Sequence, residues 1–219
     1  MDLSQLMSVI ATTIYLALGA VAVWGAFCVI LLWRSIEKKR FRSIENEDLF
    51  FSKLKEQLVE ERYEDSLKLC NSPIYWSRAV PRLAALAIEN RQSSLSRIQR
   101  MIIERFERDV LSDFEYRLSW IQTVIKSSPM LGLLGTVVGM IGAFAKLAGG
   151  DNVESQTLAG DISFALFTTA IGLVIAIPLV LCGAYVNVRI RKLENAVEDG
   201  LVRFWEVFRE TDHSSGDKK

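Results

Sequence analysis

The sequence has little of the side-chain chemistry on which enzymes depend. Its 219 residues include one histidine, His213, and three cysteines, Cys28, Cys70 and Cys182, which lie far apart. No two of them have the spacing of a zinc site or a redox motif, and one histidine in a polar tail offers no base to a nucleophile. The sequence therefore predicts a protein that is not an enzyme and that holds no metal and no cofactor.

The chain also lacks net charge, since 26 basic residues balance 26 acidic ones, and this gives no argument for nucleic acid binding. The charges are unevenly distributed, because long uncharged runs alternate with heavily charged segments. A bilayer core about 30 Å thick needs roughly 20 apolar residues of helix. The sequence predicts an all-α membrane protein with three transmembrane helices, at residues 10–33, 127–148 and 162–188.

The basic residues indicate an orientation. Only Asp2 precedes the first apolar run, whereas Arg34 and several further basic residues follow it. A cleaved signal peptide would instead need basic residues before the run, so we expect a retained anchor with its N-terminus outside. The remaining predicted segments follow from that: an outer N-terminus (1–9), a cytoplasmic helical domain (34–126), an outer loop (149–161), a cytoplasmic C-terminal helix (189–210) and a disordered tail (211–219).

Within the charged middle segment, we expect one helix over residues 45–69 and a second over 74–91, with breaks at 71–73 and 91–94. From Leu95 to Ile125 apolar residues recur at steps of three or four, with a mean period of 3.75. This pattern predicts long cytoplasmic helical extensions. The last helix is expected to continue into the second span, with a kink at Pro129.

Small residues mark the second and third spans. Gly132, Gly135 and Gly139 form a stripe on one helix face, which lets another helix backbone approach closely in lipid. The third span contains Thr168, Thr169, Gly172 and Pro178, and Thr136 lies beside the stripe. These hydroxyls could bond carbonyls of their own helices, or they could line a narrow hydrated path.

Two charged residues lie near the ends of the predicted outer loop. Asp161 shares a helix face with Phe164 and Thr168, so it could take up protons at an outer mouth. Its alternative role is that of an N-cap or first-turn residue favoured by the helix dipole. Lys146 is interpreted as an interfacial charge that extends its ammonium group toward water.

Two motifs in order carry a family resemblance. The segments PMLGLLGTVVGMI (129–141) and ALFTTAIGL (165–173), followed by Ala176-Ile177-Pro178, resemble the ExbB/TolQ/MotA proton-channel family. Three spans are typical of its ExbB/TolQ branch. The resemblance implies a pentameric ring around the single membrane helices of an ExbD/TolR-like partner, whose intramembrane Asp carries the proton. Thr136 and Thr169 match the family's threonines, whereas Phe164 stands where ExbB and TolQ proteins usually have glutamate.

The resemblance therefore implies a subunit of an inner-membrane ion channel, for protons in the first instance. With its partner, it would convert an ion gradient into mechanical work across the periplasm. Under this hypothesis Thr136, Thr168, Thr169 and Asp161 belong to the ion pathway. Gly132, Gly135, Gly139, Gly172, Pro129 and Pro178 belong to helix packing and the pore wall. The alternative hypothesis is a non-conducting membrane scaffold whose glycine stripe only holds an oligomer together.

Overall fold

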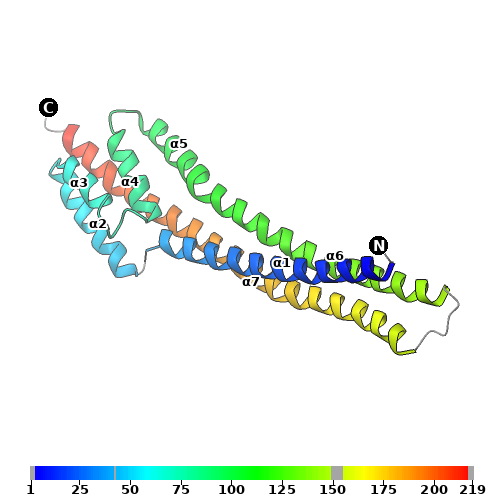
Figure 1. Cartoon of the computed structure of the whole chain (residues 1–219). Coiled ribbons are helices and arrows are strands. Elements are labelled where there is room, and N and C mark those ends of the chain that lie inside the picture. The colour runs from blue at the N-terminus through cyan, green and yellow to red at the C-terminus, as the bar shows by residue number, and fades with distance from the viewer. Residues whose placement is uncertain (1–2, 42, 149–154, 217–219) are drawn as a thin grey trace. The chain divides into compact units, whose positions relative to one another are not determined.

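The computed structural model describes residues 3–41, 43–148 and 155–216, and every regular element within them is a helix (Figure 1). Three helices are long: α1 (Leu3–Lys39), α6 (Ser112–Ala148) and α7 (Ser155–Gly216). Each contributes a stretch that is long and apolar enough to cross a membrane. The chain is therefore an all-helical, multi-pass membrane protein with three candidate spans, as the sequence predicts.

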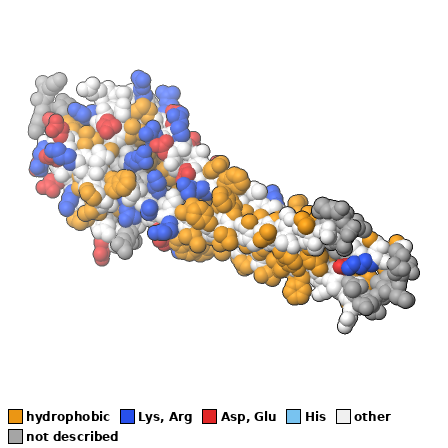
Figure 2. All heavy atoms as spheres, viewed as in Figure 1, with side chains coloured by type: hydrophobic (Ala, Val, Ile, Leu, Met, Phe, Trp, Pro, Cys, Tyr) orange, Lys and Arg blue, Asp and Glu red, His pale blue; other side chains and the backbone are white. Residues whose placement is uncertain are grey.

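The chain divides into two compact units. The first contains α1 up to Leu31, α6 from Arg117 and α7 up to Val186, and the second contains the remaining helices and helix ends. Figure 2 shows hydrophobic side chains over the surface of the first unit and a mixture of basic and acidic side chains over the second. Phe144 and Val174 in the first unit are 61% and 69% exposed. Such a surface suits contact with lipid or with other apolar helices.

Shorter helices fill the charged segment between the first two spans: α2 (Ile44–Val59), α3 (Tyr63–Cys70), α4 (Ala79–Glu89) and α5 (Leu95–Phe106). The breaks expected at 71–73 and 91–94 are found, but the first continues to residue 78, so the helix predicted over residues 74–91 begins only at Ala79. The single helix predicted over residues 45–69 is wrong, because α2 ends at Val59 and Glu61 has a φ of 57°. The break occurs at a glutamate, a residue that rarely adopts this left-handed conformation. No glycine or proline in the segment signals it.

The long apolar stripe predicted from Leu95 onward is confirmed, since every one of its residues up to Ile125 is buried or half-buried. The helix that carries it includes one π-helical turn, η1 (Glu107–Leu111), between α5 and α6. A π turn places one extra residue in the helix, which keeps a stripe with four-residue steps on one side. The π turn accounts for the mean period of 3.75 residues in the apolar stripe, which is above the ideal 3.6 residues per turn.

Two long helices continue through prolines. α6 continues through Pro129 and α7 through Pro178, so the helix predicted to continue into the second span is present. α7 also unites the third span with the C-terminal helix, and it begins at Ser155, before the predicted start of that span. Residues 149–154 of the predicted outer loop and residues 217–219 of the predicted tail lie outside the described residues.

The second unit has its own aromatic core. The Phe50 ring lies 5.0 Å from that of Tyr75 and 5.8 Å from that of Phe41. α7 packs against α4 in this unit at Gly200, where an added Cβ would lie 2.7 Å from a methyl carbon of Val80. Arg203 of α7 then pairs with Asp48 of α2 at 2.6 Å. The C-terminal part of α7 is thus held by both packing and charge.

Candidate functional site

The glycine stripe of α6 faces α7 of the same chain. A Cβ added at Gly132 would lie 2.9 Å from the Cα of Thr169, and one added at Gly139 would lie 2.8 Å from the Cβ of Ala165. On α7, a Cβ at Gly172 would lie 2.6 Å from the carbonyl oxygen of Ser128. These separations are shorter than van der Waals contact, so the two backbones lie this close only because glycine has no side chain.

Gly135 has the tightest environment of the stripe. An added Cβ would overlap the hydroxyl of Thr168 and would lie 2.6 Å from its Cβ. Thr168 is fully buried, and its branched side chain is stiff. Gly135 therefore fixes how closely α6 and α7 pair at the level of the threonines.

Three hydroxyls gather at this level, and we call Thr136, Thr168 and Thr169 the threonine cluster. The carbonyl oxygen of Gly132 lies 3.0 Å from the Thr169 hydroxyl, 3.3 Å from that of Thr136 and 3.4 Å from that of Thr168. The Thr136 and Thr169 hydroxyls also hydrogen-bond to each other. Hydroxyls on two different spans thus share one backbone acceptor.

Burial distinguishes the members of the threonine cluster. Thr168 is fully buried, and its hydroxyl donates to the carbonyls of Ala165 at 2.9 Å and Phe164 at 3.2 Å in its own helix. Thr136 and Thr169 are half-buried. Each hydroxyl has one proton, so in the Thr136–Thr169 pair one group donates to the other and can still accept a further hydrogen bond.

The charged pair Lys146–Asp161 lies near the loop that joins the two helices of the hairpin. The Lys146 ammonium is 2.7 Å from a carboxylate oxygen of Asp161, and both side chains are partly exposed. α7 begins at Ser155, so Asp161 lies beyond the first turn and is not the N-cap. The ion pair joins α6 to α7, and the backbone carbonyl of Asp161 lies 2.8 Å from where a Cβ on Gly139 would be.

Comparison with known proteins places this hairpin in a family. The model of the MotA/TolQ/ExbB proton channel family matches residues 76–199, which is more than half of the chain. The chain belongs to this family. The match includes α4, all of α6 and the whole threonine cluster, and family members are channel proteins rather than enzymes.

Individual relatives agree with this assignment. The chain is 37% identical over 98 residues to the Tol-Pal system protein TolQ of Haemophilus influenzae. The matched segment covers 45% of this chain and 41% of that protein. It is 41% identical over 63 residues to the biopolymer transport protein ExbB of Xanthomonas campestris, covering 29% of this chain and 25% of that protein. The matched segments thus span less than half of the length of both relatives.

The two prolines of the MotA/TolQ/ExbB motif segments differ in their surroundings. Pro129 is half-buried and Pro178 is exposed. A proline removes one hydrogen-bond donor from its helix, and nearby Ser or Thr hydroxyls can satisfy freed polar groups in lipid. Close to Pro129, the buried Ser128 hydroxyl donates to the Val124 carbonyl at 2.7 Å, which is not the Ile125 carbonyl that loses its helical donor to the proline.

Phe164 is a packing residue within this chain. Its ring meets that of Tyr15 in α1 edge to face, with the centroids 5.4 Å apart. Edge-to-face aromatic pairs are favourable in apolar surroundings. An aromatic contact therefore joins α1 to α7 at Phe164, the position at which the resemblance implies a glutamate.

Sequence reasoning missed three features of the site: the buried Ser128, the Tyr15–Phe164 contact and the shared acceptor role of the Gly132 carbonyl. The first could have been inferred, because Ser128 is four residues before Gly132 and so extends the small-residue stripe. The backbone acceptor has no sequence signal of its own. Among the described residues, no group of three His, Cys, Asp or Glu side chains could hold a metal ion.

Proposed function

We propose that this chain is the ring-forming subunit of an inner-membrane ion channel that works with a single-span partner of the ExbD/TolR type. The complex would use the ion gradient, in the first instance of protons, to drive mechanical work across the periplasm. Membership of the MotA/TolQ/ExbB proton channel family supports this proposal. The proposed ring is a pentamer, with the N-terminus periplasmic and the C-terminus cytoplasmic.

The observation that carries the proposal is the hydrogen-bonded pair of half-buried hydroxyls, Thr136 and Thr169, inside two apolar spans. The sequence places no ionisable group between Asp161 and Arg189 or between Lys126 and Lys146, apart from Cys182 and Tyr185. A proton that crosses the membrane needs a carboxylate or similar carrier. We infer that the partner supplies this acid, and that the hydroxyl pair accepts a hydrogen bond from its protonated form and donates to its ionised form in place of the Gly132 carbonyl.

The other members of the predicted site have supporting roles in this proposal. Thr168 is too buried within the single chain to meet a partner without movement, so it positions the pair through Gly135. Asp161 would receive ions at the outer end, where its pairing with Lys146 orients the carboxylate. The distribution of basic residues, which are concentrated after the first and third spans, supports the orientation.

The experiment replaces Thr136 with valine, which has the same shape but no hydroxyl. With a partner of the ExbD/TolR type co-expressed, we expect partner-dependent proton entry, read by a cytoplasmic pH-sensitive fluorescent protein, to fall about tenfold. Loss of a hydrogen bond to a charged group is worth roughly 1.5–3 kcal/mol. The oligomer should still form, as judged by size-exclusion chromatography of the complex in detergent.

The matched control is Thr13→Val in α1. The Thr13 hydroxyl is exposed and donates only to the Val9 carbonyl at 2.8 Å, so its loss should leave proton entry unchanged. The scaffold hypothesis predicts that both variants behave alike, because a scaffold conducts nothing. Unchanged proton entry in Thr136→Val would refute the role of the hydroxyl pair, and absence of partner-dependent entry in the unmodified protein would favour the scaffold.

A further inference from the structure

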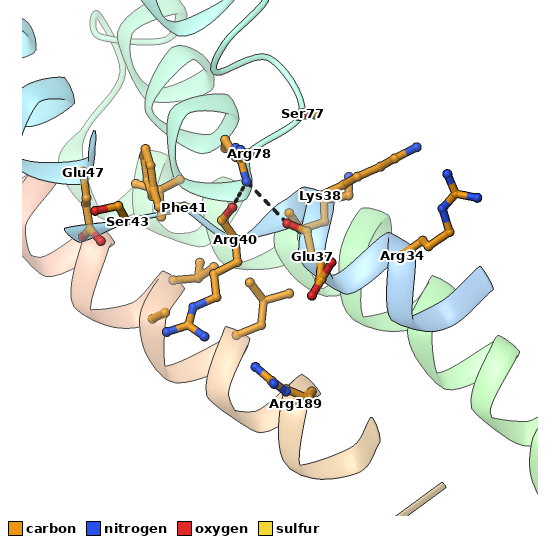
Figure 3. Close-up of a pocket in the computed structure, with 15 residues that line it drawn as sticks. Arg34, Glu37, Lys38, Arg40, Phe41, Ser43, Glu47, Ser77, Arg78 and Arg189 are labelled. Carbon is orange, nitrogen blue, oxygen red and sulfur yellow. Dashed lines mark hydrogen bonds between the residues drawn. The ribbon is translucent and has the colours of Figure 1, made fainter. Parts of the chain in front are cut away.

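A groove lies in the second unit, where the C-terminal end of α1 meets α4 and α7. It has a volume of about 860 Å³ (Figure 3). Its walls come from three separate parts of the chain: the end of α1 with the residues that follow it, the segment from Ser77 to Val80, and α7 from Arg189 to Val197. The groove is distinct from the threonine cluster, which belongs to the first unit.

The charges that line the groove are mostly positive. Only Glu37 and Glu47 are acidic, and six lining residues are basic: Arg34, Lys38, Lys39, Arg40, Arg78 and Arg189. Glu47 also faces Arg203, whose guanidinium lies 3.4 Å from it, which further reduces the negative charge. A concave surface with this balance favours an anion.

Two of the basic side chains, Arg78 and Arg189, are held in place by their neighbours. Arg78 donates hydrogen bonds to the backbone carbonyls of Arg40 and Glu37, the latter at 3.4 Å, and so ties the end of α1 to the α4 segment. The Arg189 guanidinium lies over the Trp33 ring, 5.8 Å from its centroid. In Figure 3 the guanidinium groups of Arg40 and Arg189 lie toward the same end of the groove, and Arg34 and Lys38 extend toward the other.

The groove also has an apolar part. Phe41, Val80, Leu193 and Val197 line it together with the basic groups. A small inorganic anion needs no such surface, whereas the glycerol and upper acyl chain of a phospholipid do.

The chain brings this groove to the edge of the membrane. Arg34 is the first charged residue after the uncharged run of α1, and Arg189 is the first after the uncharged run of α7. Both therefore stand where their helices leave the hydrocarbon, at the level of lipid phosphates, and Trp33 beside Arg189 is typical of that interface.

We propose that this groove binds the phosphate headgroup of an anionic phospholipid, with Arg40 and Arg189 as its principal ligands and the apolar residues against the lipid glycerol. Binding would fix the ends of α1 and α7 at the membrane surface through a lipid. This goes beyond ion conduction and does not depend on it, because a scaffold with the same groove would bind the same lipid.

The test measures binding of phosphatidylglycerol to the full-length chain purified in a neutral detergent, by native mass spectrometry across a titration. Phosphatidylcholine provides the zwitterionic comparison. We expect Arg40→Gln/Arg189→Gln to bind phosphatidylglycerol about thirtyfold more weakly than the unmodified chain, because each basic residue near a lipid surface contributes roughly fivefold. Glu37→Gln, which removes an acidic lining residue, should bind more tightly.

The matched control is Lys53→Gln/Arg97→Gln, which removes the same charge from exposed positions outside the groove. Equal weakening in this control would overturn the proposal, because it would show binding to net charge alone. Equal affinity for phosphatidylcholine, or full competition by glycerol phosphate at the lipid's own concentration, would also overturn it. The variant Arg40→Lys/Arg189→Lys retains the positive charge and so separates loss of binding from misfolding. If this variant does not bind phosphatidylglycerol although its helix content and thermal midpoint are unchanged, binding by charge is refuted.

Discussion

Replacing Gly135 of α6 with alanine tests whether the close approach of the α6 and α7 backbones holds the hairpin together. In Gly135→Ala the new Cβ would lie 2.6 Å from the Cβ of Thr168, where ordinary contact begins at 3.4 Å. A change of rotamer does not move the Cβ of Thr168, so the helices must separate by about 0.8 Å at this point. Overpacking of this kind costs about 1–3 kcal/mol.

Gly160→Ala is the control for the intrinsic effect of the substitution. Gly160 also lies in α7, but nothing lies within 4 Å of where its Cβ would be. Alanine in an exposed helix position is favoured over glycine by about 0.5–1 kcal/mol. We therefore expect Gly160→Ala to be neutral or stabilising, and about 2 kcal/mol more stable than Gly135→Ala.

The exchange is completed by Thr168→Gly, which removes the atoms that the alanine would meet. Alone it should destabilise the hairpin, through loss of helix propensity and of the buried side chain. Combined with Gly135→Ala, it should recover at least about 1 kcal/mol relative to the sum of the two single changes, because the two residues are in direct contact.

The free energies come from unfolding in mixed micelles of increasing SDS content, followed by tryptophan fluorescence, with Trp24 and Trp120 as reporters in the first unit. The reasoning is refuted if Gly135→Ala is as stable as Gly160→Ala. It is equally refuted if the double variant shows no coupling, since the contact with Thr168 would then not be the cause of the strain.

Two further predictions concern a buried thiol and an exposed ion pair. Burial raises the pKa of the Cys70 thiol to about 12. In a variant with Cys28 and Cys182 replaced by serine, Cys70 should therefore react with a thiol reagent at pH 8 only after denaturation. Rapid labelling of the native protein would show that the site opens. Asp161→Asn removes the partly exposed ion pair with Lys146 and should lower the free energy of unfolding by no more than about 1 kcal/mol, and high salt should reduce this difference. A larger loss of stability that does not depend on salt would show that Asp161 has another partner.

The spans, the family and the small-residue stripe could be inferred from the sequence because each depends on the order of residue types. A charge-free run predicts a span whatever surrounds it, and a mean repeat of 3.75 residues after Leu95 predicts a helix with one apolar side. The break at Glu61 could not be predicted in this way, because a left-handed glutamate has no compositional signal. The π turn at 107–111 left only a weak sign, the run of four-residue steps in the stripe.

The tertiary structure alone decided what the stripe and the hydroxyls contact. Glycines at 132, 135 and 139 predict close approach of some helix, but only the fold identifies that helix as α7 of the same chain. Thr168 and Thr169 are chemically identical neighbours, yet one is fully buried and the other half-buried. The physical reason is that successive helical residues point about 100° apart, so the crossing of α6 and α7 determines which hydroxyl is enclosed and which can meet a partner.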